Sequence, residues 1–593
     1  MGRLPVGSKG REAARAALLS YKQLSRAGGK VKTIWGEAGL VESEPTYAAW
    51  RRHHDAGTAD LAKQTKASRT TQQPVSTLVV IVAGGPRDSA LVARSRASLD
   101  AQSWGHRTVV EVAGIDAVNA AVEEHEADFV HLLSAGDELA PDALYHLALA
   151  AHRDPLVDLV YWDDDLLEGR SRRSPRFRPS YSPDMLTGAD YIGRSFAVRR
   201  RTFLARGGLR QGFGDAVTWD LLLRCDLPDE RVARVPRVLG HVHRRYDAVD
   251  GAGVRAVQDH LDRAGLAATA VAAGDVVRTQ WTGPLPKVTV VICTRHNRPM
   301  LSTCLPALAK TDYAGGFEVV VVDNGGQSED NDRWYADNSA GLDLAVHWWT
   351  ETPFNYPAVN NFGARQGDGD VVVFLNDDTQ VLDPTWLTEM VGWAVRPEIG
   401  VAGLQLIGPD GEIQHTGVVL GLGGFADHVF EGLEPGSQTL LGPTGWYRNV
   451  LSVTSACVAV RRELFEELGG FDERFILCGS DVAIGLDAVI KGYRNVCSPL
   501  GGVRHLESAT RDPGDIPPED FFASYWRYNP WIFGGDPYYS PNLSLGSRIP
   551  QLKREHEKTP GQRISGPLGR SFTVFRQSTT ETESTNLADL CRA

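Results

Sequence analysis

The chain has 593 residues, of which 42% are hydrophobic and 23% are charged. This length exceeds what one hydrophobic core supports and is typical of two globular domains with appendages. The formal net charge of -12 provides no global positive field, so we expect no nucleic-acid partner.

The cysteines and the apolar segments indicate a cellular compartment. The seven cysteines are scattered and lack the paired close spacings that hold zinc, which predicts a chain with reduced thiols. No segment approaches the roughly 20 apolar residues that span a bilayer, and the N-terminus lacks the apolar core of a signal peptide. We therefore expect a cytoplasmic protein whose membrane contact, if any, is peripheral.

Residues 1–74 are predicted to form a basic helical arm and a linker. Residues 1–73 carry 13 Lys and Arg against 6 Asp and Glu, and residues 11–24 favour a helix. Two interpretations stay open for the arm. It is either a solvated spacer or a basic contact with anionic lipid at the inner face of the cell membrane.

Two segments of similar pattern follow the arm. Short apolar runs at 78–82, 129–133 and 159–162 alternate with segments of helix length, which predicts a parallel α/β sheet in a domain at 75–281. The same order recurs at 288–294, 317–323 and 370–378 in a second domain at 284–545. Gly283, Pro284 and Pro286 interrupt regular structure between the two domains. Residues 546–593 are predicted to form a polar C-terminal tail.

Polar residues follow the strands of the second domain, where ligands bind in open α/β sheets. They are Thr294 and Arg295, then Asp323 and Asn324, and finally Asn376, Asp377 and Asp378. Any one of these groups could merely cap a helix or a turn, but three together predict a ligand site. Carboxylates directly after a buried strand can hold Mg²⁺ or Mn²⁺ against a diphosphate, and such a cation neutralises the charge of the leaving group.

Several motifs in this domain carry a family resemblance. They include VVICTRHNR at 290–298, NYPAVNNFGA at 355–364, VVVFLNDDT at 371–379, GEIQHTGVVLGLGG at 411–424, GSDV at 479–482 and HLESATR at 505–511. With these motifs in this order, the chain resembles family-2 glycosyltransferases of the GT-A fold, especially bacterial rhamnosyltransferase-like enzymes of surface-polysaccharide assembly. The resemblance implies an α/β protein with two tandem GT-A domains, which are Rossmann-like nucleotide-diphospho-sugar transferase domains.

The resemblance also implies roles for individual residues. The donor-binding residues would be Thr294, Arg295, Asp323, Asn376 and Asp377. Asp378 and His505 would hold the divalent cation, Mn²⁺ or Mg²⁺, although a lone histidine can equally be structural.

Asp481 matches the general base that deprotonates an acceptor hydroxyl, so that a single displacement inverts the anomeric centre. A helix cap is the competing role for Asp481, and the acidic neighbours common in relatives are replaced by Ser480 and Ala483. Trp446 and Tyr447 would either stack on an acceptor sugar or pack in a core.

The first domain resembles the same fold without its chemistry. Ser134, Ala135 and Gly136 stand where relatives carry an acidic cluster, and Thr218 occupies the position of the base. A hydroxyl cannot replace a carboxylate as a base. The acidic run at 163–165 is interpreted as structural or solvated, and the domain as one that positions the acceptor or the other domain.

These observations predict an inverting glycosyltransferase. It would move a sugar from a nucleotide-sugar donor to a growing cell-surface polysaccharide or lipid-linked glycan. Two alternatives are a bifunctional transferase with two active GT-A sites and a noncatalytic glycan-binding scaffold. The first needs carboxylates that residues 134–136 lack, and the second needs a dead second site despite Asp323, Asp378 and Asp481.

Overall fold

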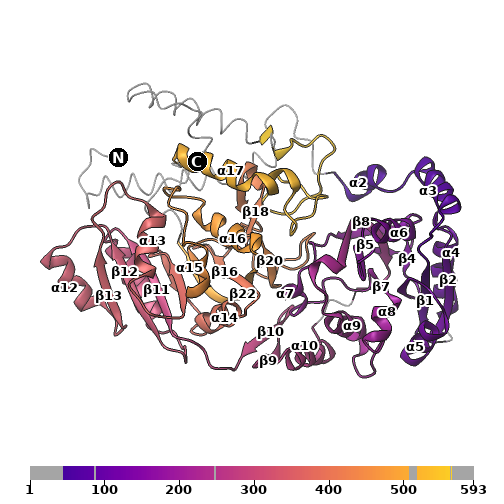
Figure 1. Cartoon of the computed structure of the whole chain (residues 1–593), viewed down its shortest axis with the longest axis horizontal. Helices are drawn as coiled ribbons and strands as arrows, with labels where there is room; N and C mark the ends of the chain where they lie inside the picture. The colour runs from indigo at the N-terminus through magenta and orange to yellow at the C-terminus, as the bar shows by residue number, and fades with distance from the viewer. Residues whose placement is uncertain (1–44, 86–87, 246–248, 507–516, 561, 564–593) are drawn as a thin grey trace.

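The computed structural model describes residues 45–85, 88–245, 249–506, 517–560 and 562–563. Two mixed sheets, each flanked by helices, lie side by side along the long axis of the molecule (Figure 1). The predicted helix at 11–24 and the last 25 or so residues of the tail lie outside the described residues. We call 75–281 the N-terminal domain and 284–545 the C-terminal domain, following the bounds expected from the sequence.

The first sheet has the strand order β2-β1-β3-β7-β5-β8-β4, with β6 paired to β5. Its strands are β1 (Thr77–Ala83), β2 (Arg107–Ala113), β3 (Phe129–Ser134), β4 (Glu138–Leu139), β5 (Leu159–Glu168), β6 (Ser171–Arg176), β7 (Phe196–Arg199) and β8 (Val232–Val242). The helices of this domain are α4 (Ser89–Asp100), α5 (Ile115–Glu124), α6 (Ala143–Arg153), α7 (Pro183–Leu186), α8 (Arg200–Ala205), α9 (Val217–Cys225) and α10 (Gly251–Arg263). A separate hairpin of β9 (Ala268–Ala273) and β10 (Val276–Trp281) leads into the second domain.

The second sheet has the order β13-β12-β11-β14-β21-β16-β22-β15, with β17 and β20 at its side. Its strands are β11 (Val288–Thr294), β12 (Phe317–Asp323), β13 (Leu344–Trp348), β14 (Val371–Leu375), β15 (Thr379–Val381), β16 (Ile399–Ile407), β17 (Ile413–His415), β20 (Arg448–Val450), β21 (Cys457–Arg461) and β22 (Arg494–His505). A small hairpin joins β18 (Val418–Leu420) to β19 (Ala426–His428). The helices are α11 (Arg298–Leu308), α12 (Glu329–Asn338), α13 (Tyr356–Ala364), α14 (Trp386–Ala394), α15 (Arg462–Glu467), α16 (Ser480–Ile490) and α17 (Pro518–Gly534).

The α/β fold class predicted from the sequence is confirmed, but the expectation of a parallel sheet is wrong. In the second sheet β14 and β16 run antiparallel to β21, and in the first sheet β3 and β5 run antiparallel to β7. The parallel part comprises β11, β12, β13 and β14, and the Val-rich runs of β11, β12 and β14 are buried at their centre. Apolar periodicity reveals a buried strand but not its direction, which explains the error.

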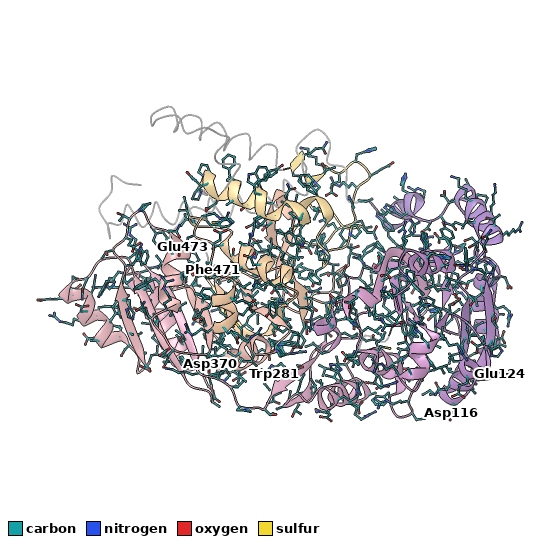
Figure 2. All side chains as sticks on the ribbon, in the orientation of Figure 1. Asp116, Glu124, Trp281, Asp370, Phe471 and Glu473 are labelled. Atoms are coloured by element: carbon teal, nitrogen blue, oxygen red, sulfur yellow. The ribbon has the colours of Figure 1, made fainter. Side chains whose placement is uncertain are left out.

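The two domains meet in a contact that mixes polar and apolar groups. The carboxylate of Asp184 accepts hydrogen bonds from Arg494 Nε at 2.8 Å and from Asn449 Nδ2 at 2.7 Å. Burial alone would raise the pKa of Asp184. The pKa nevertheless lies below its ordinary value, because the attraction of the Arg494 guanidinium outweighs the cost of desolvation. Trp281, at the end of β10, lies at the domain boundary and packs edge-on against Trp393 of α14 (Figure 2).

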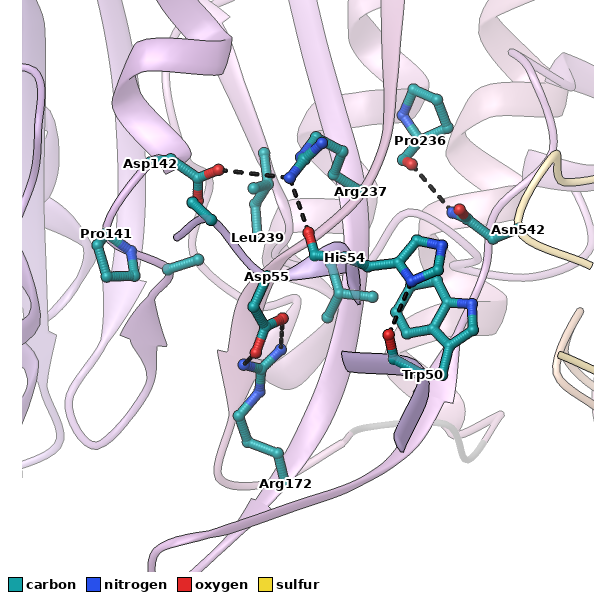
Figure 3. Close-up of a pocket in the computed structure, with 13 residues that line it drawn as sticks. Trp50, His54, Asp55, Pro141, Asp142, Arg172, Pro236, Arg237, Leu239 and Asn542 are labelled. Carbon is teal, nitrogen blue, oxygen red and sulfur yellow. Dashed lines mark hydrogen bonds and ion pairs between the residues drawn. The ribbon is translucent and has the colours of Figure 1, made fainter. Parts of the chain in front are cut away.

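The described part of the arm forms α2 (Tyr47–His54) and α3 (Thr58–Thr70) on the N-terminal domain. Figure 3 shows the contact of α2, where Asp55 pairs with Arg172 and the backbone carbonyl of His54 accepts from Arg237. The Tyr47 hydroxyl donates to Asp165 at 2.5 Å. The start of the tail packs here too, because Leu552 is buried in the same apolar cluster as Trp50. Within the described residues, no helix is long and apolar enough to cross a lipid bilayer.

Candidate functional site

The residues that follow β11 and β14 come together at one edge of the second sheet. The Thr294 hydroxyl donates to Asp377 Oδ2 at 2.6 Å. The pKa of Asp377 is raised to about 6, mainly by burial and in addition by the nearby carboxylates of Asp378 and Asp323. The predicted donor residues Thr294 and Asp377 are therefore in direct contact, within a cluster of three carboxylates.

Asp378 and His505 meet although they lie far apart in the sequence. Antiparallel pairing of β15 with β22 sets Thr379 opposite His505, and this register brings His505 Nε2 to 3.1 Å from Asp378 Oδ1. His505 Nδ1 lies 3.2 Å from the side-chain oxygen of Gln414, which can only accept a hydrogen bond. In the neutral form of the imidazole, Nδ1 then carries the proton and the lone pair of Nε2 faces the carboxylate of Asp378.

This pair fits a divalent cation. Asp378 Oδ1 is buried and has no hydrogen-bond partner among the described residues, although a lone-pair nitrogen lies beside it. Two such lone pairs repel each other unless a positive charge lies near both. The described residues contain no group of three or more His, Cys, Asp or Glu side chains arranged to hold a metal ion. A pair of protein ligands is enough for an ion such as Mg²⁺, because water and substrate phosphates fill the rest of its coordination shell.

The hydrogen bond that His505 Nδ1 donates to Gln414 orients the ring from the side opposite Asp378, as is usual for histidines that bind metal ions. Sequence reasoning quoted the GEIQHTG motif but assigned no role to Gln414 or His415. The neighbouring His415 is buried, its Nε2 accepts from the backbone of Gly417 and Thr454, and its Nδ1 lies 2.6 Å from His428 Nδ1. The sequence carried no local signal for the contact with His505, because Gln414 and His505 lie 91 positions apart.

Asp323 is fully buried, and its carboxylate is occupied by other protein groups. It accepts hydrogen bonds from His296 Nδ1 at 2.8 Å, from the Tyr335 hydroxyl at 2.6 Å and from the Gly325 amide at 2.6 Å. Asp323 thus fixes the loops after β11 and β12. Arg295, by contrast, is exposed at the same edge of the sheet. The donor roles predicted for both residues stay predictions.

Asp481 is the second residue of α16, which follows Gly479 in the left-handed conformation at φ 102°. Its Oδ1 accepts from the amide of Val482 at 2.8 Å and its Oδ2 from the amide of Ser455 at 3.1 Å. These two bonds orient a partly exposed carboxylate while leaving lone pairs on both oxygens. The cap-like geometry and a role as a base are therefore compatible.

Tyr356 connects the two parts of the site. Its hydroxyl lies 3.2 Å from Asn376 Oδ1 and 3.2 Å from Ser455 Oγ. Asn376 precedes the carboxylates of the β14 turn, and Ser455 supplies the amide that holds Asp481. Asp481 and the Asn376–Asp378 turn thus belong to one hydrogen-bonded region. Sequence reasoning missed Tyr356, which lies within the quoted NYPAVNNFGA motif.

Trp446 and Tyr447 pack between the domains, so the packing alternative describes them better than stacking on a sugar at this site. Tyr447 is fully buried, and its hydroxyl contacts Glu389 at 3.2 Å. Trp446 is 3% exposed, and its indole N–H donates to the backbone carbonyl of Asp275 at 2.9 Å. No contact among the described residues places either ring beside Asp378 or Asp481.

The N-terminal domain repeats the arrangement without the carboxylates. Thr218 is the second residue of α9, as Asp481 is of α16. The next acid, Asp137, is held by Arg194 at 3.0 Å and by His243 at 2.7 Å. A Cβ on Gly136 would lie 3.2 Å from the His243 ring, so the protein itself fills the space next to Asp137.

The acidic run of β5 is also occupied. Asp164 pairs with Arg178 at 2.5 Å and Arg245 at 3.0 Å, and Asp165 pairs with His241 at 2.8 Å. All three carboxylates of the run at 163–165 are buried. Of the two roles expected for this run, structural or solvated, the structure shows the structural one.

Comparisons with known proteins agree with this arrangement. Residues 289–469 match the family model described as glycosyl transferase family 2. The O-antigen biosynthesis protein RfbC of Myxococcus xanthus is 40% identical over 481 residues, which cover 78% of this chain and 37% of that protein. The uncharacterized protein y4gI of Sinorhizobium fredii is 33% identical over 465 residues, covering 72% of this chain and 50% of that protein. The chain thus spans half or less of the length of these two relatives.

Shorter and more distant similarities complete the comparison. The N-acetylglucosaminyl-diphospho-decaprenol L-rhamnosyltransferase of Mycobacterium tuberculosis is 35% identical over 85 residues, 14% of this chain and 24% of that protein. Among solved structures, the mannosyltransferase PcManGT from Pyrobaculum calidifontis, in complex with GDP-Man and Mn²⁺, has a TM-score of 0.31 at 16% identity and covers 52% of this chain and 79% of its own. This score is low, and the assignment depends on the sequence matches. Residues 289–469 thus form a glycosyltransferase family 2 domain, and the chain is similar to relatives named for O-antigen biosynthesis and for rhamnosyl transfer.

Proposed function

We propose that the C-terminal domain transfers a sugar, with inversion, from a nucleotide-sugar donor to a growing cell-surface polysaccharide or lipid-linked glycan. The observation that carries the proposal is the pair of Asp378 and His505 within one hydrogen-bonded region that also contains Asp481. The relatives named for O-antigen biosynthesis and for rhamnosyl transfer to a diphospho-decaprenol carrier support this class of acceptor.

In this mechanism the two ends of the site have different tasks. Asp378 and His505 would hold Mn²⁺ or Mg²⁺, which when bound supplies positive charge to the diphosphate leaving group. Thr294 and Asp377 lie beside this pair, where the donor phosphates and ribose would bind. Asp481, oriented by two backbone amides, would take the proton of the acceptor hydroxyl as that oxygen attacks the anomeric carbon.

The alternatives lack comparable support. A bifunctional enzyme would need a second set of available carboxylates, but Asp137, Asp164 and Asp165 are all engaged with Arg or His side chains. A noncatalytic scaffold would give no reason for the orphaned oxygen of Asp378 beside His505. The proposed place of action is the cytoplasmic face of the membrane.

The test is a screen of nucleotide sugars, including dTDP-rhamnose, with Mn²⁺ and with EDTA. We expect one donor to stabilise the protein thermally and to be hydrolysed slowly when Mn²⁺ is present. Asp378→Ala should abolish the difference between the two conditions, because it removes one of the two side chains that would hold the cation. Asp368→Ala, which removes an exposed carboxylate paired with Lys287, is the control. Donor binding that is equally strong in EDTA and in the Asp378 variant would refute the metal assignment.

A further inference from the structure

A cavity of about 220 Å³ lies in the N-terminal domain beside the counterpart of the catalytic site. Its walls include Asp215 and Trp219 from the start of α9 and Arg244 and Arg245 after β8. The C-terminal domain contributes Trp446. The cavity is therefore formed jointly by the two domains, although most of its lining belongs to the domain that lacks catalytic carboxylates.

The position of the cavity corresponds to the acceptor side of the catalytic domain. The first turn of α9 carries Thr218 and Trp219, just as the first turn of α16 carries Asp481. β8 pairs with β4 as β22 pairs with β15, so Arg244 and Arg245 follow the strand equivalent to the one that ends in His505. The two arginines thus lie near the equivalent of the metal position, and the cavity lies beside them.

The chemistry of the lining argues against a phosphate or a nucleotide as ligand. Four aspartates and two arginines line the cavity: Asp190, Asp215, Asp250 and Asp275 with Arg244 and Arg245. Because Asp250 caps α10 and Arg245 pairs with Asp164, the lining is a mixture of acceptors and donors and not the cluster of cations that holds a phosphate. Asp137 is already held by Arg194 and His243 and is therefore not available to bind a cation for a diphosphate. A neutral, hydroxyl-rich ligand is compatible with this mixture of acceptors and donors.

The two indole rings favour a sugar among such ligands. The Trp219 N–H donates to the carbonyl of Leu186 at 2.8 Å, and the Trp446 N–H donates to the carbonyl of Asp275 at 2.9 Å. Both rings are therefore fixed before any ligand arrives, and the small parts of them that reach the cavity, on side chains 5% and 3% exposed, add apolar contact for the C–H groups of a pyranose. The volume suits one sugar ring, being smaller than the roughly 300–1,000 Å³ pockets that hold larger ligands.

We infer that this cavity is a noncatalytic subsite for one neutral sugar residue of the acceptor glycan. The inference rests on the proposed transferase function and extends it: the degenerate domain keeps a sugar-binding cavity where it has lost the groups for chemistry. Asp190 and Asp215 accept hydrogen bonds from the sugar hydroxyls, Arg244 donates to them, and the indoles of Trp219 and Trp446 contact the ring. The acceptor is then held at two places, at this cavity and at the hydroxyl that Asp481 would deprotonate.

The experiment uses the full chain and methyl glycosides of L-rhamnose, D-mannose, D-glucose and N-acetylglucosamine, observed by saturation-transfer NMR. We expect at least one glycoside to bind, and the double change Asp190→Asn with Asp215→Asn to remove its signal. Asp215→Arg, at an exposed position on the rim, should block the same cavity without disturbing the core. Asp262→Asn, an exposed aspartate of α10 that does not line the cavity, is the matched control.

Two further readouts separate this inference from the proposed function. Donor hydrolysis by the cavity variants should equal that of the parent protein, whereas the KM for the glycan acceptor should rise about tenfold or more with little change in kcat. Absence of glycoside binding, or binding that survives both cavity variants, would overturn the subsite. Absence of donor hydrolysis in the parent protein would instead refute the transferase function, and glycoside binding would still be measurable.

Discussion

Asp378 and Asp481 have surroundings suited to different tasks. Asp378 Oδ1 is buried beside the lone pair of His505 and lacks a hydrogen-bond partner among the described residues. Asp481 is partly exposed, and both of its oxygens accept from backbone amides. The proposed metal-assisted displacement requires one carboxylate that can bind a cation and one that an acceptor hydroxyl can reach, and these surroundings suit Asp378 and Asp481 to those two roles.

The role of Asp481 can be tested with an isosteric change. Asp481→Asn keeps an oxygen that accepts from a backbone amide but removes the ability to take a proton. Transfer to the acceptor should fall by roughly a hundredfold or more, while calorimetric binding of the donor stays close to that of the parent protein. Asp487→Asn on the same helix, where the carboxylate pairs with Arg527, should retain turnover. Near-normal transfer by the Asp481 variant would remove this residue from the mechanism.

The residues of the site differ in how far the sequence could predict them. Thr294, Asp377 and Asp378 follow apolar runs, so the sequence alone indicated that they meet at one edge of a sheet. The contact of His505 with Asp378 was implied only by resemblance, because it depends on the pairing of β15 with β22. The contact between Gln414 and His505 is tertiary and has no local signal. Trp446 gave an ambiguous signal, since aromatic residues are equally suited to packing and to sugar stacking.

At the scale of elements, the glycine within α14 shows how closely the two domains pack. A Cβ built on Gly392 would lie 1.9 Å from Cδ1 of Trp281, which belongs to β10 of the other domain. In a free helix, alanine is more stable than glycine by about 1 kcal/mol. Here the close approach of the indole outweighs that preference, because neither the ring nor the helix can move without disturbing the boundary.

Gly392→Ala should therefore destabilise the protein by about 1–3 kcal/mol, the usual cost of overpacking. Thermal unfolding followed by calorimetry measures the effect. The matched control is Gly534→Ala at the end of α17, where no heavy atom lies within 4 Å and the backbone is not left-handed. The control should leave the midpoint unchanged or raise it slightly. An equal or smaller loss in the Gly392 variant would contradict the close packing of β10 against α14.

The strands were the elements that the sequence predicted best. The bounds expected at 288–294 and 317–323 coincide with β11 and β12, because an uninterrupted apolar run in this fold is a strand buried on both faces. β21 shows the limit of the method. Its residues are as apolar as those of β14, yet the chain enters it from the opposite side, and only the tertiary path of the preceding loops determines that direction.

At the scale of the whole molecule, the polar contacts between the domains are buried and specific. Asp184 is 1% exposed and meets Arg494 and Asn449 of the C-terminal domain. Breaking a buried ion pair by removing one partner costs about 3–5 kcal/mol, because the other charge is left uncompensated. The N-terminal domain is thus held in a fixed position against the C-terminal domain, as the proposed positioning of an acceptor requires.

The division of labour between the domains predicts the number of donor sites. Asp137 is paired with Arg194 and His243, and Asp164 with Arg178 and Arg245, so neither of these two acids is available to a cation. Calorimetric titration of the full chain with its donor and Mn²⁺ should therefore give about one site per chain. Asp378→Ala should reduce this number to nearly zero, because it damages the single site, whereas a second site in the N-terminal domain would leave one. Two saturable sites in the parent protein, or one full site in the Asp378 variant, would favour the bifunctional alternative.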